Sequence, residues 1–232
     1  MSLWIKICAN TSLKDALLAT EAGADAVGFV FAPSPRQVTV AQVAAITPHL
    51  PAEVEKIGVF VDSTPEDIYA TVRTCGLTGV QLHSEAGPEL PARLREWLGP
   101  GLRILRVVHF GAGAEEQAAA IAQDPNVDAV LVDSQTATAV GGTGVVFDWA
   151  VARETLFQNA ETRKCIAAGG LNPANVAQAI AMLSPWGVDV ASGVEAVPGR
   201  KNPKRVREFV AQARAAALRA EQGQKERPHG NH

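Results

Sequence analysis

Residues Gly169 to Gly199 read GGLNPANVAQAIAMLSPWGVDVASGVEAVPG, and this stretch decides the fold class. A short apolar run precedes it, a glycine pair opens it, a helical pattern follows, and a second apolar run then meets a Ser-Gly turn. Glycines let backbone N–H groups approach an anion closely, and a helix N-terminus adds a favourable dipole. One such turn would be explained as a plain tight turn. Two in succession, each predicted between a strand and a helix, indicate a phosphate-binding cup.

The rest of the chain repeats this alternation of strand and helix. Short apolar runs, typical of strands buried on both faces, are predicted at 3–8, 26–31, 56–61, 78–82, 103–108, 127–132, 164–168 and 187–191. Eight such units predict an α/β fold, a single (β/α)8 TIM barrel over residues 1–219. In such a barrel the phosphate cup belongs to the loops after strands seven and eight.

The ends of the chain fit the barrel better than an open sheet. A doubly wound sheet would usually carry its glycine fingerprint at the first turn, where this chain has Cys8-Ala9-Asn10. The last helix is predicted over 203–219. Residues 220–232 are polar, and we expect a disordered C-terminal tail there.

Composition excludes several functional classes. The 232 residues carry 21 Lys+Arg against 24 Asp+Glu, a net charge of -3, and 5% aromatics, so we expect no nucleic-acid partner. Three widely spaced cysteines suggest neither a disulfide framework nor a zinc site, and a cytoplasmic location is the simplest interpretation. The sequence shows no signal-peptide pattern and no apolar run long enough to span a membrane, so no membrane partner is expected.

Polar residues at the carboxyl ends of the strands are the candidates for chemistry, because barrels of this type place their active sites there. Cys8 ends strand one, which neighbours strand eight in a closed barrel and so lies near the cup. A cysteine is often a small buried hydrophobe, and that interpretation suits Cys75 and Cys165. Asp133 follows strand six and is a helix cap, a salt-bridge partner or a catalytic group. The long loop after it argues against a cap.

Further polar residues follow strands two to five. Arg36, after strand two, is either a ligand-binding residue or an ordinary surface arginine. Gln81 and His83 share one face at the end of strand four, where a ligand contact and a structural hydrogen bond are equally plausible. Asp62 lies beside good capping residues, which favours a capping role. For His109, at the end of strand five, the sequence favours no role.

A series of short motifs runs in order along residues 5 to 210. They are Lys6-Ile7-Cys8, Ser34-Pro35-Arg36, Gln81-Leu82-His83, Val132-Asp133, Gly141-Gly142-Thr143-Gly144 with Phe147-Asp148-Trp149, Gly169-Gly170-Leu171-Asn172-Pro173, Val188-Asp189, Ser192-Gly193-Val194-Glu195 and Pro198-Gly199. Each motif alone is modestly specific, but the ordered set is highly specific. In these motifs the chain resembles the phosphoribosylanthranilate isomerase family of tryptophan biosynthesis.

The resemblance implies a TIM barrel of the ribulose-phosphate-binding type. It implies an isomerase that converts N-(5-phosphoribosyl)anthranilate to 1-(2-carboxyphenylamino)-1-deoxyribulose 5-phosphate by an Amadori rearrangement. By resemblance, Cys8 is the general base, Asp133 the general acid and Arg36 a substrate-holding residue. Gln81 and His83 are further substrate-binding candidates because of their place at the end of strand four. The phosphate cup then comprises Gly142, Gly144, Gly170, Ser192 and Gly193. A phosphorylated small molecule is the expected partner, with no metal or organic cofactor, and the protein is a monomer or a homodimer.

The chain departs from the usual family pattern around some of these motifs. Ala9 and Ser84 stand where the family usually has glycine, Asn202 where it usually has aspartate, and Asn10 is unusual. Alanine tolerates a positive φ poorly, so we expect the turn after Cys8 to take a different shape. None of these departures removes a proposed catalytic group.

Catalysis by Cys8 needs help, because only a few per cent of a free thiol is ionised at neutral pH. A nearby cation would raise that fraction, and Lys6 shares strand parity with Cys8. The sequence leaves open which face of the strand the two side chains take. Asp133, in turn, must be protonated to act as an acid, and burial or an anionic substrate would raise its pKa.

Two other functions fit the same barrel. Another sugar-phosphate enzyme, such as a histidine-pathway isomerase or a ribulose-phosphate epimerase, is one, although the former would favour an acid where strand one ends in Cys8. A catalytically silent barrel that binds phosphometabolites or a partner protein is the other. Intact Cys8 and Asp133 argue against it, whereas Ala9 and Asn10 keep it open.

Overall fold

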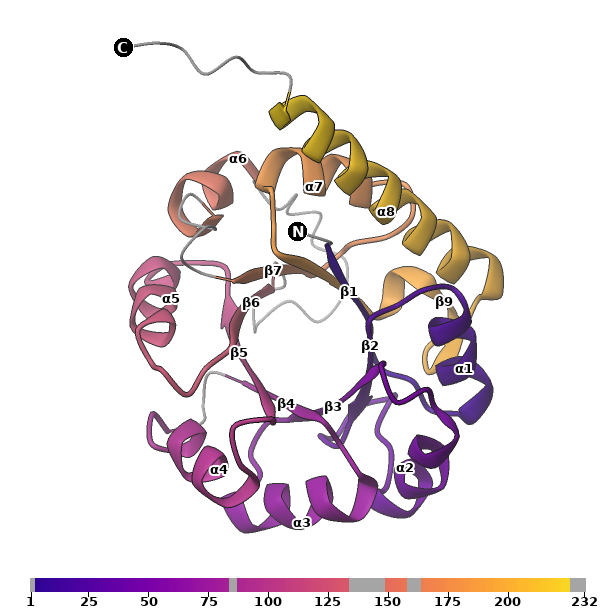
Figure 1. Cartoon of the computed structure of the whole chain (residues 1–232), viewed down its shortest axis with the longest axis vertical. Coiled ribbons are helices and arrows are strands. Elements are labelled where there is room, and N and C mark those ends of the chain that lie inside the picture. The colour runs from indigo at the N-terminus through magenta and orange to yellow at the C-terminus, as the bar shows by residue number, and fades with distance from the viewer. Residues whose placement is uncertain (1–2, 84–86, 134–148, 158–163, 226–232) are drawn as a thin grey trace.

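The computed structural model of this chain describes residues 3–83, 87–133, 149–157 and 164–225. In that part, parallel strands close into a barrel in chain order, surrounded by a ring of helices (Figure 1). The strands are β1 Trp4–Ile7, β2 Ala26–Val30, β3 Glu55–Phe60, β4 Gly79–Leu82, β5 Arg103–His109, β6 Ala129–Asp133, β7 Cys165–Ala168 and β8 Gly187–Val190. The predicted TIM barrel is confirmed, and each predicted strand lies within two residues of an observed one.

Alternating side chains of the strands fill two separate cores, as expected of a sheet buried on both faces. Outward side chains pack against the helices. Inward side chains fill the barrel and come from Trp4, Ala26, Ile57, Leu105, Val107, Ala129, Leu131, Ile166 and Ala168. The barrel is therefore packed along most of its length, and polar inward positions are concentrated at one end.

The surrounding helices are α1 Leu13–Glu21, α2 Val40–Ile46, α3 Pro65–Cys75, α4 Leu90–Leu98, α5 Ala114–Ala122, α6 Trp149–Ala152, α7 Val176–Leu183 and α8 Pro203–Lys225. Side-chain hydrogen bonds cap the N-termini of α1, α2 and α3. Thr64 caps α3 by accepting from the Asp67 N–H at 3.1 Å, and Thr39 forms a capping box with Gln42. Gly76 ends α3 with a left-handed φ of 58°.

The described chain after β6 differs from the prediction in three places. Helix α6 is short and continues as a π-helical turn, Arg153–Phe157, where the sequence predicts one helix over 147–157. The Ser-Gly turn after β8 opens only a three-residue 3-10 turn, Ser192–Val194, and a hairpin of β9 (Glu195–Val197) and β10 (Arg200–Lys201) precedes α8. Helix α8 continues to Lys225 instead of ending at Arg219, packing along α7 and α1 (Figure 1).

The α8 extension places the first part of the predicted tail, residues 220–225, in a helix. Apolar positions of α8 such as Phe209 and Ala213 are fully buried, which anchors the helix upstream of this polar stretch. Residues 226–232 lie outside the described part of the chain. The domain boundary at 219/220 therefore stays a prediction.

Aromatic and charged side chains close the N-terminal end of the barrel. Trp4 of β1 stacks on Trp186 with ring centroids 5.3 Å apart, and the Arg103 guanidinium lies 5.6 Å from the Trp186 ring. Arg103 also forms a 2.6 Å ion pair with Glu55. With this end filled, a ligand has room at the opposite end, where barrel active sites lie.

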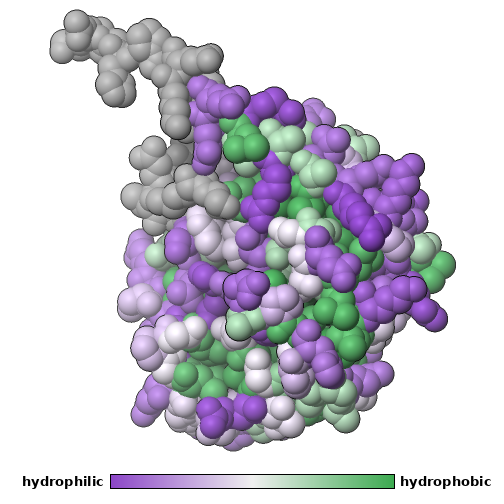
Figure 2. Space-filling view, turned by 45° about the vertical axis from the view of Figure 1, so that its right-hand side comes forward, coloured by the Kyte–Doolittle hydropathy of each residue, from purple (hydrophilic) through white to green (hydrophobic). Residues whose placement is uncertain are grey.

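Hydrophilic side chains dominate the face shown in Figure 2, with smaller hydrophobic areas between them. The exposed large hydrophobic side chains of the described residues are spread over six elements and are Val40, Tyr69, Trp97, Val151, Val197 and Leu218. Tyr69 and Trp97 contact each other edge to face, with ring centroids 5.7 Å apart, and single exposed hydrophobic residues such as the others are ordinary on a protein surface. No helix within the described ranges combines the length and the apolar character needed to cross a bilayer.

Candidate active site

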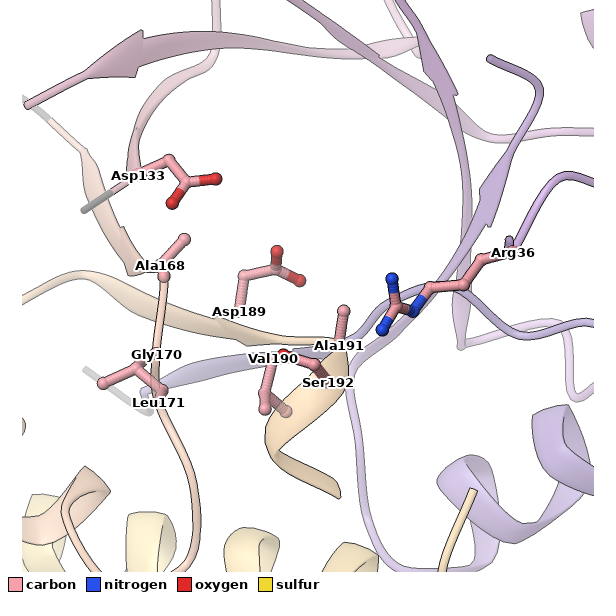
Figure 3. Close-up of a pocket in the computed structure, with 10 residues that line it drawn as sticks. Arg36, Asp133, Ala168, Gly170, Leu171, Asp189, Val190, Ala191 and Ser192 are labelled. Carbon is pink, nitrogen blue, oxygen red and sulfur yellow. The ribbon is translucent and has the colours of Figure 1, made fainter. Parts of the chain in front are cut away.

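A cavity of about 240 Å³ lies at the C-terminal end of the barrel. Its lining comes from the ends of β6, β7 and β8 and from the loop after β2, and comprises Arg36, Asp133, Ala168, Gly169, Gly170, Leu171, Asp189, Val190, Ala191 and Ser192. Figure 3 shows the carboxylates of Asp133 and Asp189 on one side and Arg36 reaching in from the other. Four of the residues proposed from the sequence thus meet in one cavity, namely Arg36, Asp133, Gly170 and Ser192.

Cys8 lies directly after β1, beside the cavity. Its N–H donates to the Val190 carbonyl at 2.8 Å, which ties it to β8, and its side chain is only 5% exposed. Burial raises the pKa of the Cys8 thiol, and the nearby Lys6 ammonium offsets part of that rise. The resting side chain is therefore a protonated thiol at neutral pH. Neighbouring charged groups must help Cys8 to lose its proton.

The turn after Cys8 keeps a left-handed backbone. Ala9 has a φ of 59°, so the expectation that alanine would reshape this turn away from positive φ is wrong. Asn10 helps to hold it: the fully buried side-chain amide donates to the Ile7 and Gly28 carbonyls at 2.8 and 3.3 Å. These bonds tie the turn to both β1 and β2.

Replacing Ala9 with glycine measures the strain in this turn. An L-residue in the left-handed region costs about 1–2 kcal/mol, which glycine does not incur. Ala19 is the comparison, because it is equally buried and lies inside α1, where glycine itself costs about 1 kcal/mol. With relief of the strain added to this cost, we expect Ala9→Gly to lose about 2–3 kcal/mol less unfolding free energy in urea than Ala19→Gly. A difference of about 1 kcal/mol or less would show that the turn is unstrained.

Lys6 points into the barrel, which settles the face that the sequence left open. Its side chain is fully buried, and its Nζ donates to Gln81 Oε1 and to Asp189 Oδ1, both at 2.8 Å. Burial alone would lower the pKa of Lys6, but the charges of Asp189 and Cys8 outweigh it and the pKa is raised. Gln81, proposed as a ligand contact, therefore has at least one structural hydrogen bond.

Arg36 is held by a carboxylate that the sequence analysis did not single out. Glu195 accepts from the Arg36 Nε at 2.9 Å and from Nη2 at 2.7 Å. Burial would raise the pKa of Glu195, but hydrogen bonds from Arg36 and the charge of Lys201 lower it below its usual range. Lys201 is itself buried and donates to Glu195 and to the Ala191 carbonyl. This network fixes the guanidinium at the edge of the cavity.

Two histidines stand at the ends of β4 and β5. The rings of His83 and His109 have centroids 5.7 Å apart. Burial, followed by the charges of His109 and Lys6, lowers the pKa of His83, which is therefore neutral at pH 7. His109 pairs in register with Asp133 on β6, so both histidines lie on the side of the mouth toward the acid.

Glycine is required in the two turns for different structural reasons. Gly169 and Gly170 have φ values of 82° and 62°, a left-handed conformation that glycine adopts readily. Gly193 instead packs so tightly that a Cβ there would lie 1.8 Å from the Leu171 carbonyl oxygen. Gly142 and Gly144 lie outside the described residues, so their part in the cup stays a prediction.

Asp189 and Glu195 are the site residues that the sequence analysis left without a role. Asp189 was detectable in principle, because it is the acidic residue in the otherwise apolar strand β8 and shares inward parity with Gly187. Glu195 carries no such signal, because its partner Arg36 lies 159 residues away in the chain. Within the described ranges, no group of three or more His, Cys, Asp or Glu residues is arranged to hold a metal ion.

Known proteins share this barrel and this sequence. The family model of N-(5'-phosphoribosyl)anthranilate isomerase matches residues 5–212. The isomerase of that name from Citrifermentans bemidjiense is 43% identical, over 92% of this chain and 98% of the relative. The solved phosphoribosyl anthranilate isomerase of Thermotoga maritima superposes with a TM-score of 0.80 at 35% identity, over 92% of this chain and 99% of that one.

A second solved structure of similar fold contains a bound ligand. It is a phosphoribosyl anthranilate isomerase in complex with reduced 1-(o-carboxyphenylamino)-1-deoxyribulose 5-phosphate, with a TM-score of 0.76 and 33% identity over 92% of this chain and 99% of that one. The matched family model covers nearly all of the barrel described above. This chain therefore belongs to the N-(5'-phosphoribosyl)anthranilate isomerase family.

Proposed function

We propose that Cys8 and Asp133 are the base and the acid of the reaction, on opposite sides of the sugar. The protein is an isomerase of tryptophan biosynthesis and converts N-(5-phosphoribosyl)anthranilate to 1-(2-carboxyphenylamino)-1-deoxyribulose 5-phosphate. The supporting observation is the cavity itself, which has Asp133 at the end of β6 and is bounded by β8, the strand to which Cys8 is bonded. A bound sugar in this cavity has an acid on one side and a thiol on the other.

The chemistry is an Amadori rearrangement, an isomerisation with no net change in composition. Asp133 donates a proton to the furanose ring oxygen, the bond between that oxygen and C1′ breaks, and a Schiff base forms. The Cys8 thiolate then removes the proton at C2′, which gives an enolamine. The enolamine becomes the ketone by gaining a proton at C1′ and losing its enol proton, and exchange with solvent restores the starting states of Asp133 and Cys8. Each positioned proton transfer typically contributes about 10² to 10⁴ in rate.

Arg36 is the proposed anchor for the anthranilate carboxylate. Glu195 occupies the Nε–Nη2 edge of the guanidinium, and the side chain reaches the cavity from the β2 side (Figure 3). Because arginine pairs with carboxylates in a fork geometry, a guanidinium held in place can orient the aromatic ring. His83 and Gln81 complete the substrate-binding set, with neutral His83 at the mouth and Gln81 deeper in the barrel.

The phosphate is proposed to bind at the turns that contain Gly170 and Ser192. Gly170 and Ser192 both line the cavity, and both are solvent-exposed. Backbone N–H groups in left-handed turns form concave sites for anions. Gly193 supports this cup from behind, since its missing side chain lets the turn pack against the Leu171 carbonyl.

A glycine-to-alanine pair tests the phosphate site. We expect Gly170→Ala to raise KM about tenfold or more, because a hydrogen bond to a charged group contributes about 1.5–3 kcal/mol. Gly76→Ala is the matched control: Gly76 has a similar φ of 58° and equally open surroundings, but it ends α3. Its strain should lower stability equally and leave KM unchanged. An unchanged KM in Gly170→Ala would remove this turn from the phosphate site.

The remaining proposals concern partners and location. We propose a monomer or a homodimer, since the Thermotoga maritima relative is described as a dimeric isomerase from which monomers were generated. A cytoplasmic location suits a base that must remain a reduced thiol, and none of the three cysteines forms a disulfide. The mechanism uses side chains alone and calls for no metal or organic cofactor.

Turnover of N-(5-phosphoribosyl)anthranilate by the purified protein tests this assignment. We expect the fluorescence of the anthranilate group to change as substrate is consumed, with no cofactor added. A histidine-pathway isomerase or a ribulose-phosphate epimerase would leave this substrate unchanged, and so would a barrel that only binds phosphometabolites. Binding without turnover would therefore contradict the proposed roles of Cys8 and Asp133.

A further inference from the structure

We propose that Lys6 is a positioning residue for Cys8, and that Asp189 opposes it. In this arrangement, the Lys6 ammonium favours the Cys8 thiolate from inside the barrel, while the Asp189 carboxylate disfavours it. The inference rests on the proposed function, in which Cys8 is the base. Beyond that function, we infer that the charges of Lys6 and Asp189 govern how readily the Cys8 thiol loses its proton.

The first support is the packing of Lys6 against Cys8. Both side chains lie over Gly28 of β2, the strand next to β1. A Cβ placed on Gly28 would lie 2.6 Å from the Cys8 Sγ and 3.0 Å from the Lys6 Cε. The sulfur and the end of the lysine side chain therefore share the space that this glycine leaves, and any larger residue on β2 would separate them.

The second support is that Lys6 is held in one place. Its side chain is fully buried, and two of the three ammonium N–H groups have partners in Gln81 and Asp189, each at 2.8 Å. Lys6 and Asp189 are also partners in the β1–β8 register, so the backbone brings them together. A buried ammonium with a carboxylate partner keeps its charge, and it presents that charge to the neighbouring sulfur.

The charged groups around Cys8 do not act equally. Lys6, Lys201 and Arg36 favour the thiolate, and Asp189 disfavours it. Lys201 and Arg36 are both bonded to Glu195, which offsets their charge. Lys6 is the cation that shares the space over Gly28 with Cys8, and Asp189 is the carboxylate that offsets the charge of Lys6. The two members of one ion pair therefore act on the thiol in opposite directions.

This arrangement predicts that removing Lys6 and removing Asp189 shift the pH midpoint of Cys8 ionisation in opposite directions. A nearby opposite charge shifts a titration by about one to three pH units. Removing the cation with Lys6→Met should move the midpoint for Cys8 ionisation upward by about one pH unit or more. Removing the carboxylate with Asp189→Asn should move it downward. A loss of structure in both variants would instead move both midpoints toward that of an unfolded thiol.

The experiment follows the alkylation of each cysteine by iodoacetamide as a function of pH, with mass spectrometry to separate Cys8 from Cys75 and Cys165. Lys56→Met is the matched control, because Lys56 is a buried strand lysine whose Nζ donates to the Pro51 carbonyl instead of facing Cys8. The double variant Lys6→Met/Asp189→Asn removes both charges together and guards against a single variant that does not fold. The pH dependence of kcat/KM is measured on the same proteins.

At a pH below the midpoint, we expect Cys8 alkylation to slow about tenfold in Lys6→Met and to accelerate in Asp189→Asn. The double variant should lie between them, Lys56→Met should match the wild type, and the rising limb of kcat/KM should follow the same shifts. Unchanged alkylation in Lys6→Met, or shifts of the same sign in both single variants, would overturn the inference even if Cys8→Ala is inactive. Conversely, an active Cys8→Ala variant would overturn the proposed base, whatever the alkylation shows.

Discussion

Replacing Cys8 with alanine is expected to lower kcat by at least about 10², the usual contribution of a general base. We expect Cys8→Ser to recover little of this loss, because a hydroxyl is a far weaker base than a thiolate. The position of Cys8 supports this expectation, because Cys8 is hydrogen-bonded to β8 at the cavity and lies beside the buried Lys6 over Gly28. Steady-state kinetics with N-(5-phosphoribosyl)anthranilate measure the effect.

The other two cysteines provide matched controls. Cys75 at the end of α3 and Cys165 on β7 are at least as buried as Cys8 and bond to backbone carbonyls away from the cavity. Their alanine variants should lose about 1 kcal/mol of stability or somewhat more and keep their kcat. Near-full turnover in Cys8→Ala together with its loss in Cys165→Ala would contradict the base assignment.

The proposed base Cys8 determines the direction in which kcat/KM changes with pH. Burial raises the pKa of Cys8, with Lys6 offsetting part of the rise, so the active thiolate is the minor form at neutral pH. We therefore expect kcat/KM to rise with pH across neutrality, as the thiol of the free enzyme loses its proton. Saturating inorganic phosphate should slow the alkylation of Cys8, because it occupies the cavity beside this side chain.

Replacing Asp133 with asparagine is the second large effect. The amide keeps the shape of the side chain but has no acidic proton to donate, so we expect kcat to fall by about 10² or more while KM changes only a few-fold. Asp133 is the last residue of β6 and points into the cavity (Figure 3), which places it within reach of a bound sugar.

Asp128 is the control for this change. It lies just before β6, at the opposite end of the barrel, where it pairs with Arg95 at 3.0 Å and accepts from the Ile104 N–H at 2.7 Å. Asp128→Asn should lower the stability and leave kcat unchanged. A near-normal kcat in Asp133→Asn would contradict the acid role of Asp133.

The barrel could be predicted from the sequence because its strands are local features. Each predicted apolar run between helical patterns corresponds to a strand of the barrel. Cys8 and Asp133 could be placed at the mouth by the same logic, since both follow apolar strands. Their catalytic roles come from the family resemblance and stay proposals.

The features that could not be predicted from the sequence depend on contacts between distant residues. Lys6 and Asp189 lie 183 residues apart, and only the β1–β8 register brings them together. Ala9 keeps its left-handed φ because Asn10 anchors the turn through buried hydrogen bonds, which override the preference of alanine. The turn after β8 resembled a helix start, but its main helix begins only after the β9–β10 hairpin.

A crystal structure of this protein with reduced 1-(o-carboxyphenylamino)-1-deoxyribulose 5-phosphate tests the central claim most directly. The account predicts the Cys8 sulfur and the Asp133 carboxylate on opposite sides of the sugar, Cys8 toward C2′, and the phosphate at the Gly170 and Ser192 turns. Hydrogen-bond reach between Asp133 and the oxygen derived from the ring would support the acid role. A ligand with both groups on the same side of the sugar, or with its phosphate away from these turns, would contradict the account.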